Sequence, residues 1–179
     1  MLLDRKILEK KIRKNIVRAE QSRLGKLNRY NLIYTKSEAV FNDLAILTAT
    51  IFDTHIAVIN FVDQDNVWSK VKIQSSQESD FTNETSVCSL AIIDEEGGLF
   101  EGLSISPRLM SNALIASEMG MKFYAAVPIT TDEGFNVGSV CIVDKEHRAF
   151  LPNDREKLEW VATTVRKEMN KRMAKKIYA

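Results

Sequence analysis

Two cysteines are the side chains in this sequence best suited to chemistry. Cys88 and Cys141 lie far apart, each within an apolar stretch, VCSLAII and GSVCIV. A thiol whose neighbours stabilise the thiolate can sense oxidants or contact a ligand. A buried cysteine also behaves as a small hydrophobic side chain, and this simpler interpretation is favoured for both. Two widely separated cysteines do not make a disulfide framework.

The other candidates for catalysis or metal binding do not form a set. His55 and His147 are the only histidines, and neither has a partner at metal-ligand spacing. The sequence has no glycine-rich phosphate loop, and neither histidine can be grouped with a serine and a carboxylate. Asp132 and Glu133 lie in the turn-rich segment TTDEGFN and are interpreted as turn chemistry. We therefore expect neither a metal site nor an enzymatic activity.

Charge is distributed unevenly along the chain. Residues 1–30 carry a net charge of +7 and residues 166–179 a net charge of +5, which leaves −11 for residues 31–165. Basic ends can bind nucleic acid or anionic lipid. Solvated helix faces explain them more simply, so neither partner is expected. No apolar run approaches the ~18 residues of a membrane span, and the charged first residues do not resemble a secretory signal. We expect a cytoplasmic protein.

The first half of the chain predicts two helices and a hairpin. Apolar residues recur at steps near four in residues 2–24, which predicts an amphipathic helix that Gly25 ends. A packed core helix is expected over residues 38–52, with Ser37 as its N-cap. Residues 56–62 are apolar on both faces, as in a strand covered on both sides. A polar turn and the alternating stretch VWSKVKI complete a β-hairpin.

The second half predicts another hairpin and a long final helix. Short helices are expected in residues 87–94 and 107–118, with a short strand LFEGL between them. KFYAAVPI and VGSVCIVD flank a turn and predict the hairpin, in which Gly138 allows close approach of a neighbouring backbone. From Pro152 onward, apolar residues at steps of three or four predict one helix whose last turns project.

These elements predict an α+β fold: a central antiparallel sheet of about five to six strands, with helices on its faces and long N- and C-terminal helices. Five segments carry a resemblance to a known family. They are FNDLAILTATIFDTHIAVINFVDQDNVW, TSVCSLAII, SPRLMSNALI, KFYAAVPI and GSVCIVDKEHRAFLPND. In this order and spacing the chain resembles a GAF domain, the sensory module common in bacterial histidine kinases, cyclases, phosphodiesterases and transcription regulators. The resemblance runs from about Arg23 to Lys167.

The resemblance implies a small-molecule cavity between the sheet and the segments near residues 86–120. Leu90, Leu103 and Ala113 replace a histidine, an aspartate and a proline that are frequent in the family. A surviving pocket would therefore be more apolar, and the leucines could equally fill it. Residues 107–120 contain neither cysteine nor histidine, so no covalent bilin is expected. By position, the expected lining residues are Asn60, Trp68, Cys88, Phe100, Met110, Phe123, Tyr124 and Cys141.

The resemblance also implies an organisation and a function. It divides the chain into an N-terminal amphipathic segment (1–36), a sensory core (37–152) and a C-terminal helix (153–179). We expect a homodimer that passes a ligand signal through its terminal helices to an output domain, or to a partner protein in trans, in a signalling protein such as a histidine kinase. The expected dimer contacts are Leu3, Ile7, Ile12, Ile16, Val165, Met169 and Met173.

Two alternatives stay open at this point. The first is a ligand-free dimerisation module whose pocket is filled by its own side chains. The second is an enzyme similar to the free methionine sulfoxide reductases of the same family, which depend on placed cysteines. The two cysteine neighbourhoods of this chain do not resemble that branch.

Overall fold

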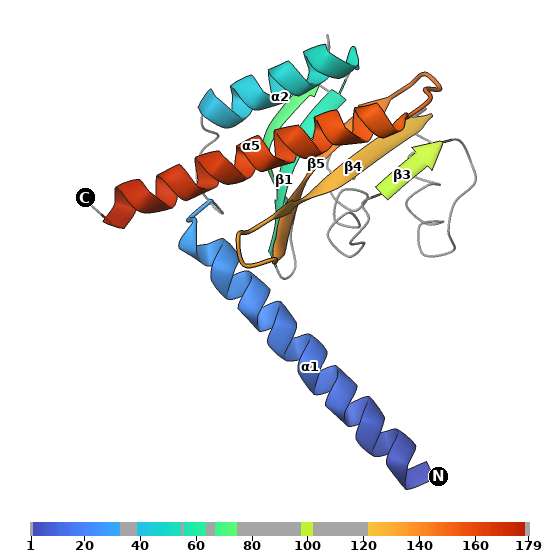
Figure 1. The fold of residues 1–179 in the computed structure, drawn as a ribbon, viewed down its shortest axis with the longest axis vertical. Helices are drawn as coiled ribbons and strands as arrows, with labels where there is room; N and C mark the ends of the chain where they lie inside the picture. The colour runs from blue at the N-terminus through green and yellow to red at the C-terminus, as the bar shows by residue number, and fades with distance from the viewer. Residues whose placement is uncertain are drawn as a thin grey trace.

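The computed structural model describes the chain in six stretches. They are residues 2–32, 39–54, 56–63, 67–74, 98–101 and 122–177. Ser37 as a helix cap and the short helices expected in residues 87–94 and 107–118 lie outside this described part. Within it the fold is α+β, with an antiparallel sheet and helices on one of its faces (Figure 1). The predicted fold class is confirmed at this level.

The described strands form one sheet in the order β2-β1-β5-β4-β3. Their bounds are β1 (Ile56–Val62), β2 (Val67–Gln74), β3 (Gly98–Glu101), β4 (Phe123–Thr130) and β5 (Asn136–Asp144). Neighbouring strands are antiparallel in every pair. Both predicted hairpins, β1–β2 and β4–β5, are present. The second contributes the middle strand of the sheet, as the family resemblance implies.

Two helices, α2 (Ala39–Phe52) and α5 (Pro152–Ile177), cover one face of the sheet (Figure 1). Phe41 on α2 and Leu158 on α5 are fully buried, together with Phe61 on β1. The rings of Phe41 and Phe61 meet edge to face with their centroids 6.0 Å apart. Burial of each such side chain stabilises the fold by roughly 1.5–3 kcal/mol. This core is what holds the sheet and both helices together.

The start of α5 follows from local sequence. Pro152 is its first residue, a position where the missing N–H costs nothing and the fixed φ already suits the helix. Asp154 is the third residue of α5, and its carboxylate accepts a hydrogen bond of 3.1 Å from the backbone amide of Leu151. This bond, more than the neighbouring Lys157, holds the pKa of Asp154 below its ordinary value. The carboxylate also suits the positive end of the helix dipole.

The first helix, α1 (Leu2–Arg29), is continuous through Gly25, so the predicted break at this glycine is wrong. The helical hydrogen bonds tolerate one glycine at a cost of about 1 kcal/mol. The helix ends instead at Arg29. Two residues later Asn31 adopts a left-handed φ of 49°, a conformation that asparagine tolerates just past helix ends. The last part of α1 packs on the body through buried Leu27, and Tyr30 just past the helix end is buried with it. The rest extends away from the sheet (Figure 1).

Among Gly25, Gly134 and Gly138, the missing side chain decides how strands pack at Gly138. It pairs with Phe61 of β1 across the β1–β5 ladder. A Cβ atom at this position would lie 2.1 Å from the backbone oxygen of Asn60 and 3.1 Å from the Phe61 ring. The predicted close backbone approach is confirmed, because β1 and β5 could not keep this spacing with any other residue.

Candidate functional site

The face of the sheet opposite α2 and α5 has its own cluster of buried residues. β1 supplies Ile56 and Val58, β4 supplies Tyr124 and Ala126, and β5 supplies Cys141. The register explains the grouping, because Val58 and Ala126 both pair with Cys141 across their ladders. Directly paired residues of antiparallel strands point to the same face. This is the face on which the family resemblance places a cavity.

A buried polar group lies at the centre of this face. The Cys141 Sγ atom is 3.3 Å from the Ser139 hydroxyl, 3.5 Å from the Tyr124 hydroxyl and 3.8 Å from the Asn60 amide nitrogen, which donates to it. Ser139 and Cys141 are fully buried, and Asn60 and Tyr124 are 1% and 7% exposed. We call these four residues the polar cluster. Its hydroxyl, amide and thiol groups can donate and accept hydrogen bonds, and none of them carries a formal charge.

The structure brings three of the expected lining residues together: Asn60, Tyr124 and Cys141. Phe123 does not join them, because it alternates with Tyr124 along β4 and so points to the opposite face. Its ring lies against Phe150 in the helix-side core, with 6.1 Å between centroids. Ser139, which was not expected at this site, completes the cluster. It precedes Cys141 by two residues on one strand, and this spacing was the available signal.

The remaining expected lining residues are placed only in part. Trp68 lies on β2, where it pairs with Phe61, and Phe100 lies on β3, where it pairs with Tyr124. Their side chains lie outside the described part of the structure. Cys88 and Met110 lie outside it altogether.

The expected dimer contacts on α5 need correction. Val165 and Met169 are fully buried within the helix-side core of the same chain. Their stripe therefore faces the sheet, and a partner subunit cannot reach it. Met173, one turn further along, is only partly buried against this core. A stripe of apolar residues does not by itself reveal whether it packs inside one chain or between two.

The expected stripe on α1 also divides. Ile16, Arg23 and Leu27 follow one another at spacings of seven and four, so they share one side of the helix. Arg23 and Leu27 pack on the body, and Ile12 continues this side. Leu3 and Ile7 precede Ile12 by nine and five positions and lie on another side. The side chains of Leu3, Ile7, Ile12 and Ile16 lie outside the described part.

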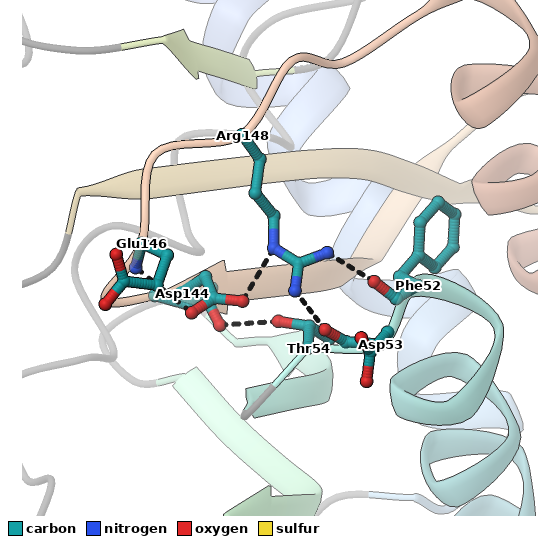
Figure 2. Close-up of polar contacts among 7 residues, drawn as sticks. Phe52, Asp53, Thr54, Asp144, Glu146 and Arg148 are labelled. Carbon is teal, nitrogen blue, oxygen red and sulfur yellow. Dashed lines mark hydrogen bonds and ion pairs between the residues drawn. The ribbon is translucent and has the colours of Figure 1, made fainter.

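Arg148 joins the end of β5 to the end of α2 (Figure 2). Its guanidinium donates from Nε to the Asp144 carboxylate at 2.6 Å, and from its two terminal nitrogens to the backbone oxygens of Phe52 and Asp53. The Asp144 side chain is fully buried, whereas that of Arg148 is 28% exposed. Asp144 also accepts a bond of 3.1 Å from the Glu146 amide. A planar donor with several N–H groups suits this combination of one carboxylate and two carbonyls.

The geometry of the α2 terminus explains why Arg148 is useful there. The Thr54 amide bonds back to the Ala49 oxygen at 3.0 Å, and the Asp53 amide bonds to the Thr50 oxygen at 3.3 Å. Asp53 has a φ of 46°. This is the hydrogen-bond pattern of a helix C-terminus that usually ends on glycine. Arg148 supplies donors to the two helix-end carbonyls that this pattern leaves without helical partners.

A second set of polar contacts surrounds the turn between β4 and β5. Glu133 forms an ion pair of 2.5 Å with Lys26 on α1. The Asp132 carboxylate accepts a hydrogen bond of 2.8 Å from the side-chain amide of Asn170 and lies 3.4 Å from the Arg166 guanidinium, and both partners are on α5. Asp132 and Glu133 therefore do more than shape a turn. No local sequence signal could have shown this, because their partners lie far away in the chain.

A cavity of about 240 Å³ lies where α1, this turn and α5 meet. Its walls come from Lys26, Arg29, Tyr30, Asp132, Glu133, Asn170 and Met173. The Tyr30 hydroxyl donates to Asn170 at 3.2 Å. Burial, with the nearby carboxylates of Glu133 and Asp132, raises the pKa of Tyr30 above its ordinary value. Tyr30 therefore stays a neutral donor at neutral pH.

Among the residues that the structure describes, no group of histidine, cysteine and acidic side chains could hold a metal ion. In the same part of the chain, no helix is both long and apolar enough to span a membrane. His147 is exposed and follows β5, and His55 lies outside the described residues.

The comparisons with known proteins agree on one family. The sequence matches the family model described as GAF domain over residues 37–169. It is also 30% identical over 139 residues to a cyclic di-GMP phosphodiesterase of Pseudomonas aeruginosa, an alignment that covers 74% of this chain and 22% of that protein. The chain thus spans only about a fifth of this curated relative.

Solved structures agree on the fold. A domain of a two-component sensor histidine kinase from Sinorhizobium meliloti superposes with a TM-score of 0.57 at 12% identity, covering 79% of this chain and 96% of the other. A free methionine-R-sulfoxide reductase from Thermoplasma acidophilum superposes with a TM-score of 0.60 at 12% identity, covering 75% and 93%. At this identity the similarity extends to the fold alone.

Proposed function

The chain belongs to the GAF domain family, and from this premise we propose that it is a sensory domain that binds a small molecule beside its sheet. The polar cluster is the observation that supports this proposal. Four hydrogen-bonding side chains are gathered on the buried face opposite α2 and α5. Polar groups inside a protein cost free energy unless they are hydrogen-bonded. The members of the cluster hydrogen-bond one another, and the same groups can also donate to and accept from a bound molecule.

The ligand would contact Asn60, Tyr124, Ser139 and Cys141 directly. These groups suit a molecule with hydrogen-bonding edges and an apolar body, because Ile56, Val58 and Ala126 surround them. Trp68, Cys88, Phe100 and Met110 belong to the same proposal as further lining residues.

The domain would act within a signalling protein, in the cytoplasm. The relative in Pseudomonas aeruginosa is a cyclic di-GMP phosphodiesterase, and the chain matches only 22% of it. A regulatory domain attached to a separate output domain, such as a histidine kinase or a phosphodiesterase, accounts for a match of this extent. An output protein bound in trans would serve equally.

Homodimerisation through the terminal helices belongs to the same proposal. Seven described residues in the first two-thirds of α1 are exposed in the single chain, and Val17 among them is 54% exposed. A long helix that leaves the body in this way gains most of its stability from packing on a partner. The side of α1 that carries Ile12 and Ile16 is the favoured contact, because it continues the side that already packs on the body.

Two other functions have less support. In a ligand-free dimerisation module the four polar groups would only satisfy one another, and residues on this face would be replaceable by apolar ones. In a methionine sulfoxide reductase the thiol must be activated as a thiolate, and the described contacts of Cys141 are with neutral groups.

A binding experiment distinguishes the sensor from the module. The wild-type protein is dialysed against a low-molecular-weight extract of its host, and the retained compounds are identified by mass spectrometry. Tyr124→Phe and Ser139→Ala remove one hydroxyl each, and Val17→Ala alters an exposed residue far from the cluster. We expect a compound retained by the wild type and by Val17→Ala, and depleted in both cluster variants. Equal retention by all four proteins, or none by any, would contradict the proposal.

A further inference from the structure

The turn between β4 and β5 stands between the polar cluster and the terminal helices. Tyr124 lies on β4, and Ser139 and Cys141 lie on β5. The two strands that carry these groups are therefore joined directly by this turn. A shift of these side chains can therefore reach the turn along β4 and β5 without crossing another element. β5 is also the middle strand of the described sheet.

The two carboxylates of the turn contact different helices. Glu133 pairs with Lys26 in the last turn of α1, with 2.5 Å between the charged atoms. Asp132 contacts Asn170 and Arg166 of α5 at 2.8 and 3.4 Å. Adjacent residues in one turn thus hold the end of α1 and the middle of α5. Among the described elements, no other turn contacts both terminal helices through ion pairs.

Hydrogen bonds hold the turn together and tie it to the ends of its strands. The Thr131 amide donates to the Phe135 oxygen at 2.9 Å, and the Gly134 amide donates to the Thr131 oxygen at 3.0 Å. Gly134 has a φ of 88°, a conformation that glycine adopts readily. At the strand ends, the Thr130 hydroxyl donates to the Asn136 side chain at 2.7 Å. Internal bonds of this kind transmit a displacement rather than absorb it.

We infer that Asp132 and Glu133 couple the polar cluster to the relative position of α1 and α5. This inference rests on the proposed function and adds the route by which a bound ligand changes the helices. A ligand that favours one arrangement of β4 and β5 also favours one set of turn contacts, because both belong to the same strands. Coupling between two sites is reciprocal, so a change in the turn must also be felt at the cluster.

Exposure suits these contacts to switching. The Glu133 and Asp132 side chains are 45% and 62% exposed, and ion pairs of such groups break and re-form at little cost. The neighbouring cavity of about 240 Å³ leaves space beside them. The pair Asp144–Arg148 at the other end of β5 differs, because Asp144 is fully buried. The strand thus has a fixed attachment to α2 at one end and adjustable attachments to α1 and α5 at the other.

Removal of the two charges tests the inference. Asp132→Asn and Glu133→Gln are combined in one protein, which keeps the size and shape of both side chains. The matched control combines Glu168→Gln and Lys171→Gln, which removes the exposed 2.6 Å ion pair of α5. Two quantities are measured in each protein: the backbone amide resonances of Ser139 and Cys141 by NMR, and the distance between spin labels at the exposed positions 18 and 174 by pulsed electron resonance.

We expect the turn variant to shift the Ser139 and Cys141 resonances and to broaden or displace the label distance distribution. The control variant should change neither. If the turn variant shifts only resonances near the substituted residues and leaves the label distance as in the wild type, the inference is overturned. That result would leave the proposed function standing, because ligand retention is measured separately.

Discussion

The attachment of β5 to α2 through Arg148 makes the sharpest prediction about stability. Arg148→Ala removes three donated hydrogen bonds at once: to the carboxylate of Asp144 and to the backbone oxygens of Phe52 and Asp53. The Asp144 side chain is fully buried. The substitution therefore leaves a buried carboxylate without its cationic partner, and leaves two helix-end carbonyls to find water.

The size of the effect follows from burial. Removing one partner of a buried ion pair costs about 3–5 kcal/mol. Arg148 itself is 28% exposed, and the Glu146 amide still donates to Asp144, so we expect the lower end of that range, about 3 kcal/mol. Arg148→Lys should recover only part of this loss, because one ammonium group cannot match the planar guanidinium that reaches three acceptors.

Chemical denaturation provides the assay. The free energy of unfolding is measured in urea for the wild type, Arg148→Ala and Arg148→Lys, with the slope against urea checked for constancy. Arg155→Ala is the matched control, since its ion pair with Glu159 at 2.9 Å joins side chains that are 46% and 51% exposed. We expect the control to lose less than about 1 kcal/mol.

A loss of less than about 1 kcal/mol for Arg148→Ala, no larger than for the exposed control, would contradict a stabilising role of Arg148. It would mean that water and the Glu146 amide satisfy Asp144 as well as Arg148 does. The attachment of β5 to α2 would then contribute little to the fold.

Three further predictions concern packing, pH and assembly. In urea denaturation, Gly138→Ala should destabilise the fold by about 2 kcal/mol or more through overpacking, whereas Gly25→Ala should stabilise it by about 0.5–1 kcal/mol. A tolerated Gly138→Ala would contradict the clash expected between the added Cβ atom and the backbone oxygen of Asn60. The hydrogen bond from Arg23 holds the pKa of Glu20 below its ordinary 4.5, so its stabilisation is present above pH 4.5 and is lost as the pH falls through the lower folded-state value. Glu20→Gln should therefore flatten the loss of stability below pH 4.5, and an unchanged acid profile would argue against the contact. Ile16→Glu should convert a dimer to monomer in light scattering while the exposed Asn15→Glu does not, and equal effects would remove this side of α1 from the interface.

Local patterns predicted much of the fold. Residues 56–62 are apolar on both faces, and the observed β1 (Ile56–Val62) is buried along six of its seven residues. Pro152 starts α5 as expected, and Gly138 meets the backbone of β1 as expected. These features are encoded by periodicity, helix-capping chemistry or a single glycine, so a short window of sequence contains the information.

Contacts between distant segments were not predictable in the same way. Arg148 bonds to residues about one hundred positions earlier in the chain, and no pattern near residue 148 indicates this. Likewise, Val165 and Met169 form an apolar stripe that fits a dimer interface and an internal core equally well, and only the packed fold shows that they face the sheet. Ser139 differs, because its two-residue spacing from Cys141 on a predicted strand was enough to place both on one face.

In the proposed function, a small molecule occupies the face of the sheet that carries the polar cluster. A native mass spectrum of protein purified gently from its own host tests this most directly. We expect a dimer that carries a discrete extra mass, and we expect this extra mass to be lost from Tyr124→Phe purified in the same way. A wild-type dimer of bare chain mass, with Tyr124→Phe giving the same spectrum, would contradict it.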